Sequence, residues 1–157
     1  MRKLNPEYLK TISEIVSASP YFSLLSMEIR ALEHNFCCLE ARLAEKHLQP
    51  FGAVHGGVYA SLIDAATFWA VFMAVDEGLG MTTVELKTNY LAPASKGILR
   101  AAGKGIKVGR TLCLGEATVT DGDGRLLAHG TATMMIMREL MIQGDEKHPP
   151  KFLNEPG

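Results

Sequence analysis

The stretch of sequence that decides the fold runs from Gln49 to Gly78 and reads QPFGAVHGGVYASLIDAATFWAVFMAVDEG. Between Val58 and Val75 it has no Pro or Gly, and its only charged side chain is that of Asp64. A segment that is apolar on nearly every face is typical of a helix buried on all sides. The stretch therefore predicts one long helix inside the protein, ended by Gly78.

Asp64 is the residue of this helix that needs a chemical explanation. Burying an unpaired carboxylate is costly or raises its pKa, so such a group is usually paired, hydrogen-bonded or functional. Upstream of it the helix begins at His55-Gly56-Gly57. The first N–H groups of a helix have no partner inside it, and glycines let another group approach the backbone closely. The helix start is therefore a candidate site for a carbonyl oxygen or an oxyanion.

The spacing of Gly57 and Asp64 also predicts an oligomer. At a rise of about 1.5 Å per residue, the two residues lie about 10 Å apart along the helix axis. A catalytic group must come within about 3 Å of its target or act through one water. Two copies of the helix packed antiparallel would bring the carboxylate of one near the start of the other. An active site built from these residues would then be shared across a dimer.

The segments around the helix predict an α+β fold, in which one antiparallel β-sheet packs on the long central helix. Asn5-Pro6-Glu7 starts a short amphipathic helix that ends near Pro20. Period-2 patterns and turn signals predict strands at 24–31, 36–44, 82–91, 97–108, 111–120 and 126–137. The strand at 82–91 is expected to be half-buried. We expect an N-terminal helical segment at 1–22, one main domain at 23–137 and a flexible C-terminal tail at 138–157.

Composition excludes several classes of protein. The chain has 157 residues, enough for a single domain, a net charge of −1 and 21% charged residues without a basic run. That charge pattern predicts no nucleic acid and no membrane surface as partner. The chain opens without an apolar signal segment, and a cytoplasmic location is expected. Cys37, Cys38 and Cys113 lack metal-ligand spacing, so they are expected to be small buried side chains, with no metal and no cofactor.

Three motifs taken together resemble the hotdog-fold acyl-CoA thioesterases, most closely the phenylacetate-degradation type. The motifs are QPFGAVHGG at 49–57, LID at 62–64 and VELKTNYLAP at 84–93. The resemblance covers roughly residues 23–137. It implies a central helix wrapped in an antiparallel sheet, dimers that often pair into tetramers, and hydrolysis of acyl-CoA thioesters without a metal.

The resemblance also implies roles for five residues. Asp64 matches the catalytic carboxylate, which acts as general base for water or as nucleophile. Gly56 matches the residue whose N–H polarises the thioester carbonyl. Gln49 falls where the family has an amide near the carbonyl or the attacking water, and His55 falls on the motif histidine, for which we expect a positioning role. Thr83 matches a position that in some members bears a hydroxyl holding the water.

The sequence departs from the family at one place. Some aryl-CoA relatives carry Ser or Thr four residues after the carboxylate, where this chain has Phe68. Thr67 lies one residue earlier and, at about 100° per residue, still near the Asp64 face of the helix. The sequence leaves open whether Thr67 or Thr83 orients the water, and whether the acyl group is aryl or fatty.

Thioester hydrolysis is the leading function of three that we consider. Thiolate is a good leaving group, so a lone carboxylate that activates water is sufficient, and no Gly-x-Ser-x-Gly nucleophile motif is present. The second function is a hotdog dehydratase or hydratase, which would use His55 with Asp64. The third is a non-catalytic acyl-CoA binding module. Basic residues around one hairpin are candidates for the coenzyme A phosphates, namely Lys104, Lys107 and Arg110.

Overall fold

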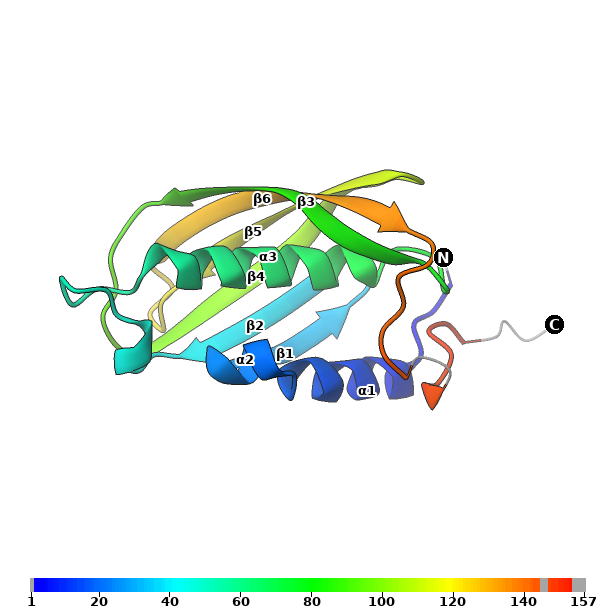
Figure 1. Ribbon diagram of the computed structural model, residues 1–157, viewed down its shortest axis with the longest axis horizontal. Coiled ribbons are helices and arrows are strands. Elements are labelled where there is room, and N and C mark those ends of the chain that lie inside the picture. The colour runs from blue at the N-terminus through cyan, green and yellow to red at the C-terminus, as the bar shows by residue number, and fades with distance from the viewer. Residues whose placement is uncertain (1, 145–146, 154–157) are drawn as a thin grey trace.

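One long helix lies against a curved sheet in the computed structural model, which describes residues 2–144 and 147–153 (Figure 1). The described helices are α1 (Pro6–Ser17), α2 (Pro20–Leu24), a short 3-10 helix η1 (Glu45–His47) and α3 (Gly56–Phe72). The strands are β1 (Met27–Glu33), β2 (Phe36–Arg42), β3 (Gly80–Tyr90), β4 (Ile98–Val108), β5 (Leu112–Thr120) and β6 (Leu126–Met137). They form one antiparallel sheet in the order β1-β2-β4-β5-β6-β3. The predicted α+β fold with a central helix is confirmed.

The element boundaries differ from the predictions mainly near caps. The helix expected from Val58 begins at Gly56, because the His55 side chain caps it, and its regular part ends at Phe72. The first strand begins at Met27 and not at residue 24, because a second short helix, α2, occupies the preceding residues. The other five strands lie within two residues of their predicted bounds.

Glycines in the sheet let α3 lie very close to it. A Cβ atom at Gly103 would meet the carbonyl oxygen of Ala66 at 2.2 Å, and one at Gly130 would meet the Ile63 side chain at 2.9 Å. Both glycines sit within strands, where the missing side chain usually marks close approach of another backbone. The face of α3 toward the sheet is accordingly buried, and these close contacts fix the position of the helix along the strands.

The described parts of the C-terminal segment (residues 138–144 and 147–153) pack against the rest of the chain, where the sequence predicted a loose tail. Phe152 forms a bridge with Leu4, so the two ends of the described chain lie side by side near α1 (Figure 1). Lys151 is only 2% exposed. Its Nζ donates hydrogen bonds to the carbonyl oxygens of Phe72 and Val75, at the end of α3. These contacts join residues far apart in the sequence, which local patterns do not predict; residues 145–146 and 154–157 of the predicted tail lie outside the described residues.

Strand β3 forms one edge of the sheet and exposes the residues that were expected to be half-buried. Val84 is 52% exposed and Tyr90 57%, and Leu86 is exposed as well. The register shifts between Thr83 and Glu85, which leaves Val84 as an extra residue opposite β6. The prediction that this apolar stripe is buried is therefore wrong for the single chain. An exposed apolar edge strand is a surface suited to pairing with another strand.

The three cysteines were expected to be buried, and two of them are. Cys37 and Cys113 are buried, Cys38 is partly buried, and all three are free thiols. Burial raises the pKa of the Cys37 thiol, so this thiol stays protonated. Among the residues that the structure describes, no helix is long and apolar enough to cross a membrane.

Candidate active site

Asp64 and Thr83 meet on the face of α3 that looks toward strand β3. The Thr83 hydroxyl donates a 2.8 Å hydrogen bond to Oδ1 of Asp64. Within the described part of the chain, Thr83 is the only group that donates to this carboxylate. The second carboxylate oxygen therefore remains available to a water molecule. Two residues that the sequence placed in the site, 19 positions apart, are thus brought into direct contact.

The surroundings of Asp64 make its carboxylate more basic than usual. Burial disfavours the charged form and raises the pKa of this carboxyl, and the hydrogen bond from Thr83 opposes part of that rise. The adjoining hollow, which has a volume of about 380 Å³, is lined mainly by apolar side chains, including Phe68, Trp69 and Leu86. A half-buried carboxylate beside an apolar hollow can take a proton from water more readily than an exposed one.

Thr67, unlike Thr83, does not contact the Asp64 carboxylate with its hydroxyl. Its hydroxyl is fully buried and donates within α3, to the carbonyl oxygens of Ile63 and Asp64 at 2.8 and 2.9 Å. A Thr hydroxyl bonded to the preceding helical turn is unavailable to a water at the carboxylate. Of the two hydroxyls that the sequence left open, Thr83 is the one in contact with the Asp64 side chain.

The start of α3 presents an N–H group without a partner. The Nδ1 atom of His55 accepts a 2.9 Å hydrogen bond from the N–H of Gly57, which makes His55 the N-cap of the helix. The neighbouring N–H of Gly56 has no acceptor among the described residues. A Cβ atom at Gly56 would lie 3.0 Å from the ring of Tyr90, so only a glycine lets this ring sit so close. His55 thus caps the start of α3, and the Gly56 N–H remains without an acceptor among the described residues.

Gln49 shapes the loop before α3 and lies outside the Asp64 hollow. Its side-chain oxygen accepts a hydrogen bond from the N–H of Phe51, and its backbone pairs with Ala53 and Gly52. In the single chain, Gln49 therefore caps its own turn. Gly56 and Asp64 also stay apart, because eight residues of helix separate them by about 12 Å. Their joint action in one site would need a second copy of the chain.

Sequence reasoning missed two groups near the site. The hydroxyl of Tyr21, from α2, lies 2.8 Å from that of Ser61, and Ser61 in turn donates to the carbonyl oxygen of Gly57. Tyr21 and Ser61 line the same hollow as Asp64. The position of Ser61, three residues before Asp64 on the same helix, could have indicated its place. No local pattern indicates that Tyr21 reaches this helix.

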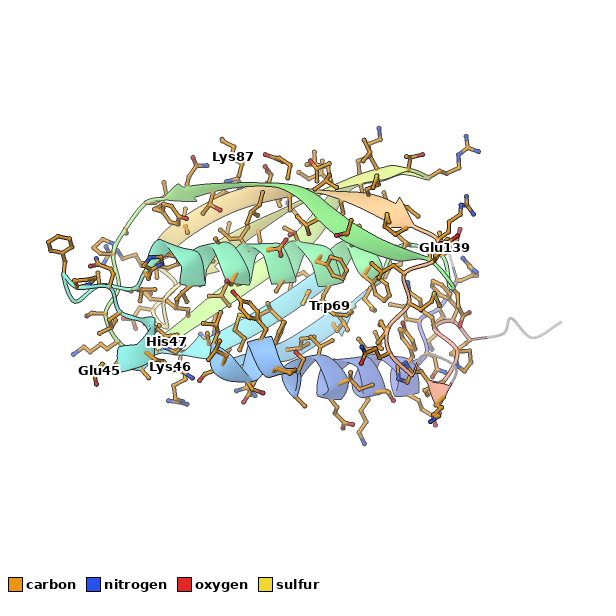
Figure 2. The ribbon with its side chains drawn as sticks, viewed as in Figure 1. Glu45, Lys46, His47, Trp69, Lys87 and Glu139 are labelled. Carbon is orange, nitrogen blue, oxygen red and sulfur yellow. The ribbon has the colours of Figure 1, made fainter. Side chains whose placement is uncertain are left out.

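His47 was also missed, and it supports the loop that leads into the site. Its ring is buried, with Nδ1 accepting from the N–H of Ala44 at 2.9 Å. The proton is therefore on Nε2, which donates to the carbonyl oxygen of Leu25 at 2.8 Å. The carbonyl oxygen of His47 accepts from the N–H of His55. His47 thus links η1, whose three residues are labelled in Figure 2, to the start of α3.

The candidate phosphate-binding residues lie on β4 and the turn after it. Lys104 is paired with Glu116, with 3.1 Å between Nζ and Oε1. Lys107 and Arg110 are exposed. In the described residues, no group of three or more His, Cys, Asp and Glu side chains is arranged to hold a metal ion.

Comparison with known proteins agrees with this geometry. A family model of the thioesterase superfamily matches residues 51–128, which include the start of α3 and Asp64. A Saccharolobus solfataricus protein named as a suspected esterase is 31% identical over 131 residues, covering 83% of this chain and 93% of that protein. Mouse acyl-coenzyme A thioesterase 13 is 26% identical, covering 81% of this chain and 90% of the relative. A crystal structure of a Haemophilus influenzae thioesterase superposes with a TM-score of 0.80 at 21% identity, covering 90% of this chain and 98% of that one.

The chain belongs to the thioesterase superfamily. It has the hotdog fold, in which the antiparallel sheet wraps around α3, and it is a thioester hydrolase.

Proposed function

We propose that the protein hydrolyses acyl-CoA thioesters to the free acid and coenzyme A, with Asp64 as the general base. The observation that carries this proposal is the Asp64 carboxylate, half-buried beside an apolar hollow, with Thr83 on one oxygen and the other oxygen open. The similarity to a named acyl-coenzyme A thioesterase supports the choice of substrate.

In the proposed reaction, Asp64 takes a proton from a water molecule as the water oxygen attacks the thioester carbonyl. The carbonyl oxygen becomes negatively charged, and the free N–H of Gly56 stabilises it together with the positive end of α3. The carbon–sulfur bond then breaks, and the thiolate of coenzyme A leaves and takes up the proton. Thr83 holds the carboxylate in place throughout.

The proposed site is completed by a second copy of the chain. Strand β3 is an open edge with exposed Val84, Leu86 and Tyr90. Two such edges paired antiparallel would join the sheets and place the two α3 helices side by side in opposite directions. Asp64 of one copy could then face the Gly56 N–H of the other, which the single chain keeps about 12 Å away.

The direct test of the proposal measures thiol release from a panel of aryl- and straight-chain acyl-CoAs. We expect turnover by the wild type and a loss of about 10²–10⁴-fold in kcat for Asp64→Asn. The matched control is Asp123→Asn, because Asp123 is an exposed carboxylate in the β5–β6 turn. Normal turnover by Asp64→Asn would remove Asp64 as the base. Formation of an enoyl thioester from a 3-hydroxyacyl-CoA would favour the dehydratase, and saturable binding without thiol release would favour the binding module.

A second test addresses the dimer. We expect light scattering after size exclusion to give a dimer for the wild type and a monomer for Val84→Lys, which places a charge in the apolar edge. The monomer should release little thiol, because the Gly56 N–H and Asp64 no longer meet. Ile106→Lys is the matched control, since Ile106 is equally exposed but lies on β4, inside the sheet. An active, dimeric Val84→Lys protein would show that β3 is not the interface.

A further inference from the structure

A second hollow lies directly beyond the one at Asp64. We call it the tail pocket: it lies between the end of α3, the start of β3 and the C-terminal segment, and it has a volume of about 220 Å³. Phe68 and Trp69 line both hollows, so the two are neighbours that share two walls. Trp69 projects from α3 toward the N-terminal helices (Figure 2).

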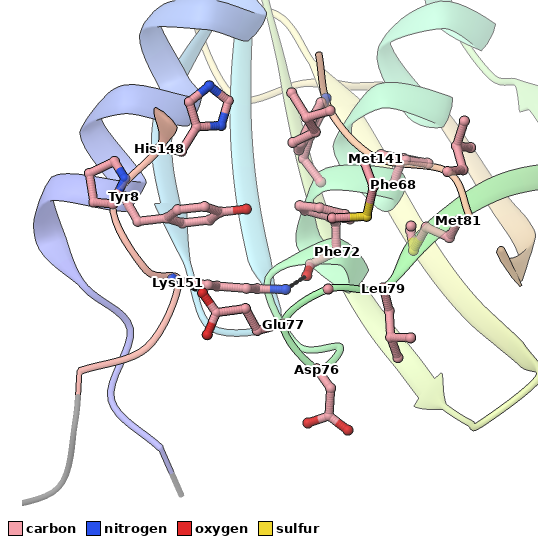
Figure 3. A pocket seen from close by; sticks show the side chains of 16 residues that line it. Tyr8, Phe68, Phe72, Asp76, Glu77, Leu79, Met81, Met141, His148 and Lys151 are labelled. Atoms are coloured by element: carbon pink, nitrogen blue, oxygen red, sulfur yellow. Dashed lines mark hydrogen bonds between the residues drawn. The ribbon is translucent and has the colours of Figure 1, made fainter. Parts of the chain in front are cut away.

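The walls of the tail pocket are apolar near Asp64 and charged at the far end. Phe72 stacks on Phe68 with 6.0 Å between ring centroids, and Met81 and Met141 lie against the same space (Figure 3). The far end is bordered by charged and polar groups, among which are Asp76, Glu77 and Lys151. Aromatic rings and flexible methionines are suited to an uncharged, apolar guest.

The C-terminal segment is held firmly enough to serve as a wall. A Cβ atom at Gly80 would come within 1.6 Å of the carbonyl oxygen of Leu140, so the segment crosses β3 in direct backbone contact. Lys151 ties its other end to the carbonyl oxygen of Phe72, the last residue of α3, and to that of Val75 just beyond the helix. The same helix therefore carries Asp64 and anchors the wall of the pocket.

We propose that the acyl group of the substrate runs from Asp64 past Phe68 and Trp69 into the tail pocket, where the C-terminal segment sets the longest acyl group accepted. This inference rests on the proposed acyl-CoA hydrolysis. An apolar cavity of about 150 Å³ holds a benzene ring, so the tail pocket suits a somewhat larger uncharged group, of phenylacetyl or octanoyl size. Along the α3 axis, Phe68 lies about 6 Å and Phe72 about 12 Å beyond Asp64. An extended eight-carbon chain spans roughly 9 Å, so it would end between these two rings, inside the tail pocket.

The test fills the tail pocket and measures thiol release from butyryl-, octanoyl- and phenylacetyl-CoA. Met141→Trp should lower kcat/KM for octanoyl- and phenylacetyl-CoA by at least about tenfold relative to butyryl-CoA. Met137→Trp is the matched control, since Met137 is a partly exposed methionine at the end of β6 that lines neither hollow. We expect the octanoyl-to-butyryl ratio of kcat/KM in Met137→Trp to equal that of the wild type. An unchanged octanoyl-to-butyryl ratio in Met141→Trp would overturn the assignment of the pocket.

A binding measurement separates this inference from the proposed hydrolysis. Trp69 is the only tryptophan of the chain, and it lines both hollows, so its fluorescence reports on a bound acyl group. We expect the non-hydrolysable thioether S-octyl-CoA to change this fluorescence in a saturable way, and coenzyme A alone to leave it unchanged. If no thioester is hydrolysed but S-octyl-CoA gives this signal, the pocket stands and the proposed hydrolysis fails. If thioesters are hydrolysed and S-octyl-CoA gives no signal, the hydrolysis stands and the pocket is overturned.

Discussion

The two ends of α3 are treated in opposite ways. A helix leaves N–H groups without partners at its start and carbonyl groups without partners at its end. At the end of α3, Lys151 donates to the Phe72 and Val75 carbonyls and is itself buried. At the start, His55 caps the N–H of Gly57, while that of Gly56 has no acceptor among the described residues. The carbonyl groups at the buried end of α3 thus have hydrogen-bond donors. At the start of the helix, where we propose that substrate binds, one N–H donor has no acceptor in the described part of the chain.

The largest effect that we expect from this contrast comes from removing the free donor. Gly56→Pro deletes one N–H and nothing else that the helix uses, because proline is well suited to the first helical position. The backbone of His55, at φ −64° and ψ 138°, is already in the region that a following proline requires. Loss of one donor to an oxyanion typically lowers the rate by about 10²–10³-fold. We expect a loss of that size in kcat for thiol release, with the circular dichroism of a folded protein.

The matched control for this variant is Gly56→Ala. It keeps the N–H but adds the methyl group that would lie 3.0 Å from the Tyr90 ring, which can shift by a few tenths of an ångström at the exposed surface. We expect Gly56→Ala to retain much more activity than Gly56→Pro. Equal activities in the two variants would show that the N–H of Gly56 does not act on the substrate.

The next largest effect is on stability, and it comes from removing the hydrogen bonds that Lys151 makes at the end of α3. Lys151→Met keeps a long apolar stem against the Phe72 ring but removes both hydrogen bonds, to the Phe72 carbonyl in α3 and to the Val75 carbonyl just after it. Hydrogen bonds from charged groups contribute about 1.5–3 kcal/mol each, and buried carbonyls left without a donor carry a penalty. We expect the free energy of unfolding in urea to fall by about 3 kcal/mol.

Lys147→Met is the comparison for this measurement, because Lys147 is exposed on the same segment. It should leave the urea midpoint close to that of the wild type. If Lys151→Met were as stable as Lys147→Met, the contacts of Lys151 would be incidental to the fold.

The same contrast explains which features could be predicted from the sequence. The start of α3 is encoded locally: His55, Gly56 and the apolar run that follows stand next to one another, and Asp64 is the one charge in that run. The end of α3 is completed by Lys151, 79 residues after Phe72, and no periodicity links the two. Local patterns therefore did not indicate that residues 138–144 and 147–153 of the predicted tail pack against the rest of the chain. The contact of Tyr21 with Ser61 was not predicted for the same reason, since it joins α2 to α3 across 40 positions of the sequence.

Strand β3 shows a different limit of sequence reasoning. Its alternating apolar residues predicted burial, yet Val84 and Tyr90 are exposed in the single chain. Alternation shows that one face of a strand is apolar and does not show which molecule covers it. The sequence therefore identified an apolar face but not that the single chain leaves it exposed, and the partner that we propose for it is a second copy of the chain.

The smallest effect that we expect is on the pH dependence of stability, and it comes from Asp64 in the middle of α3. Asp64 has a raised pKa, so between the pKa of the unfolded chain and that of the folded protein the folded state binds more protons. Stability from this group is therefore present at acidic pH and is lost as the pH rises through the folded pKa. Asp64→Asn stays neutral, and above that range we expect it to unfold at higher urea than the wild type, although it is inactive. A wild type that gains stability relative to Asp64→Asn as the pH rises would contradict the direction of the shift.

Thr83→Val sharpens this prediction, because it removes the hydrogen bond that lowers the pKa of Asp64. The reaction needs the ionised carboxylate, so activity falls on the acid side as Asp64 becomes protonated. With the opposing hydrogen bond gone, the pKa rises further, and the acid limb of kcat/KM against pH should move to higher pH. Thr82→Val, at the neighbouring position of β3, should leave the limb in place. An acid limb that stays in place in both variants would mean that the group titrating in it is not Asp64.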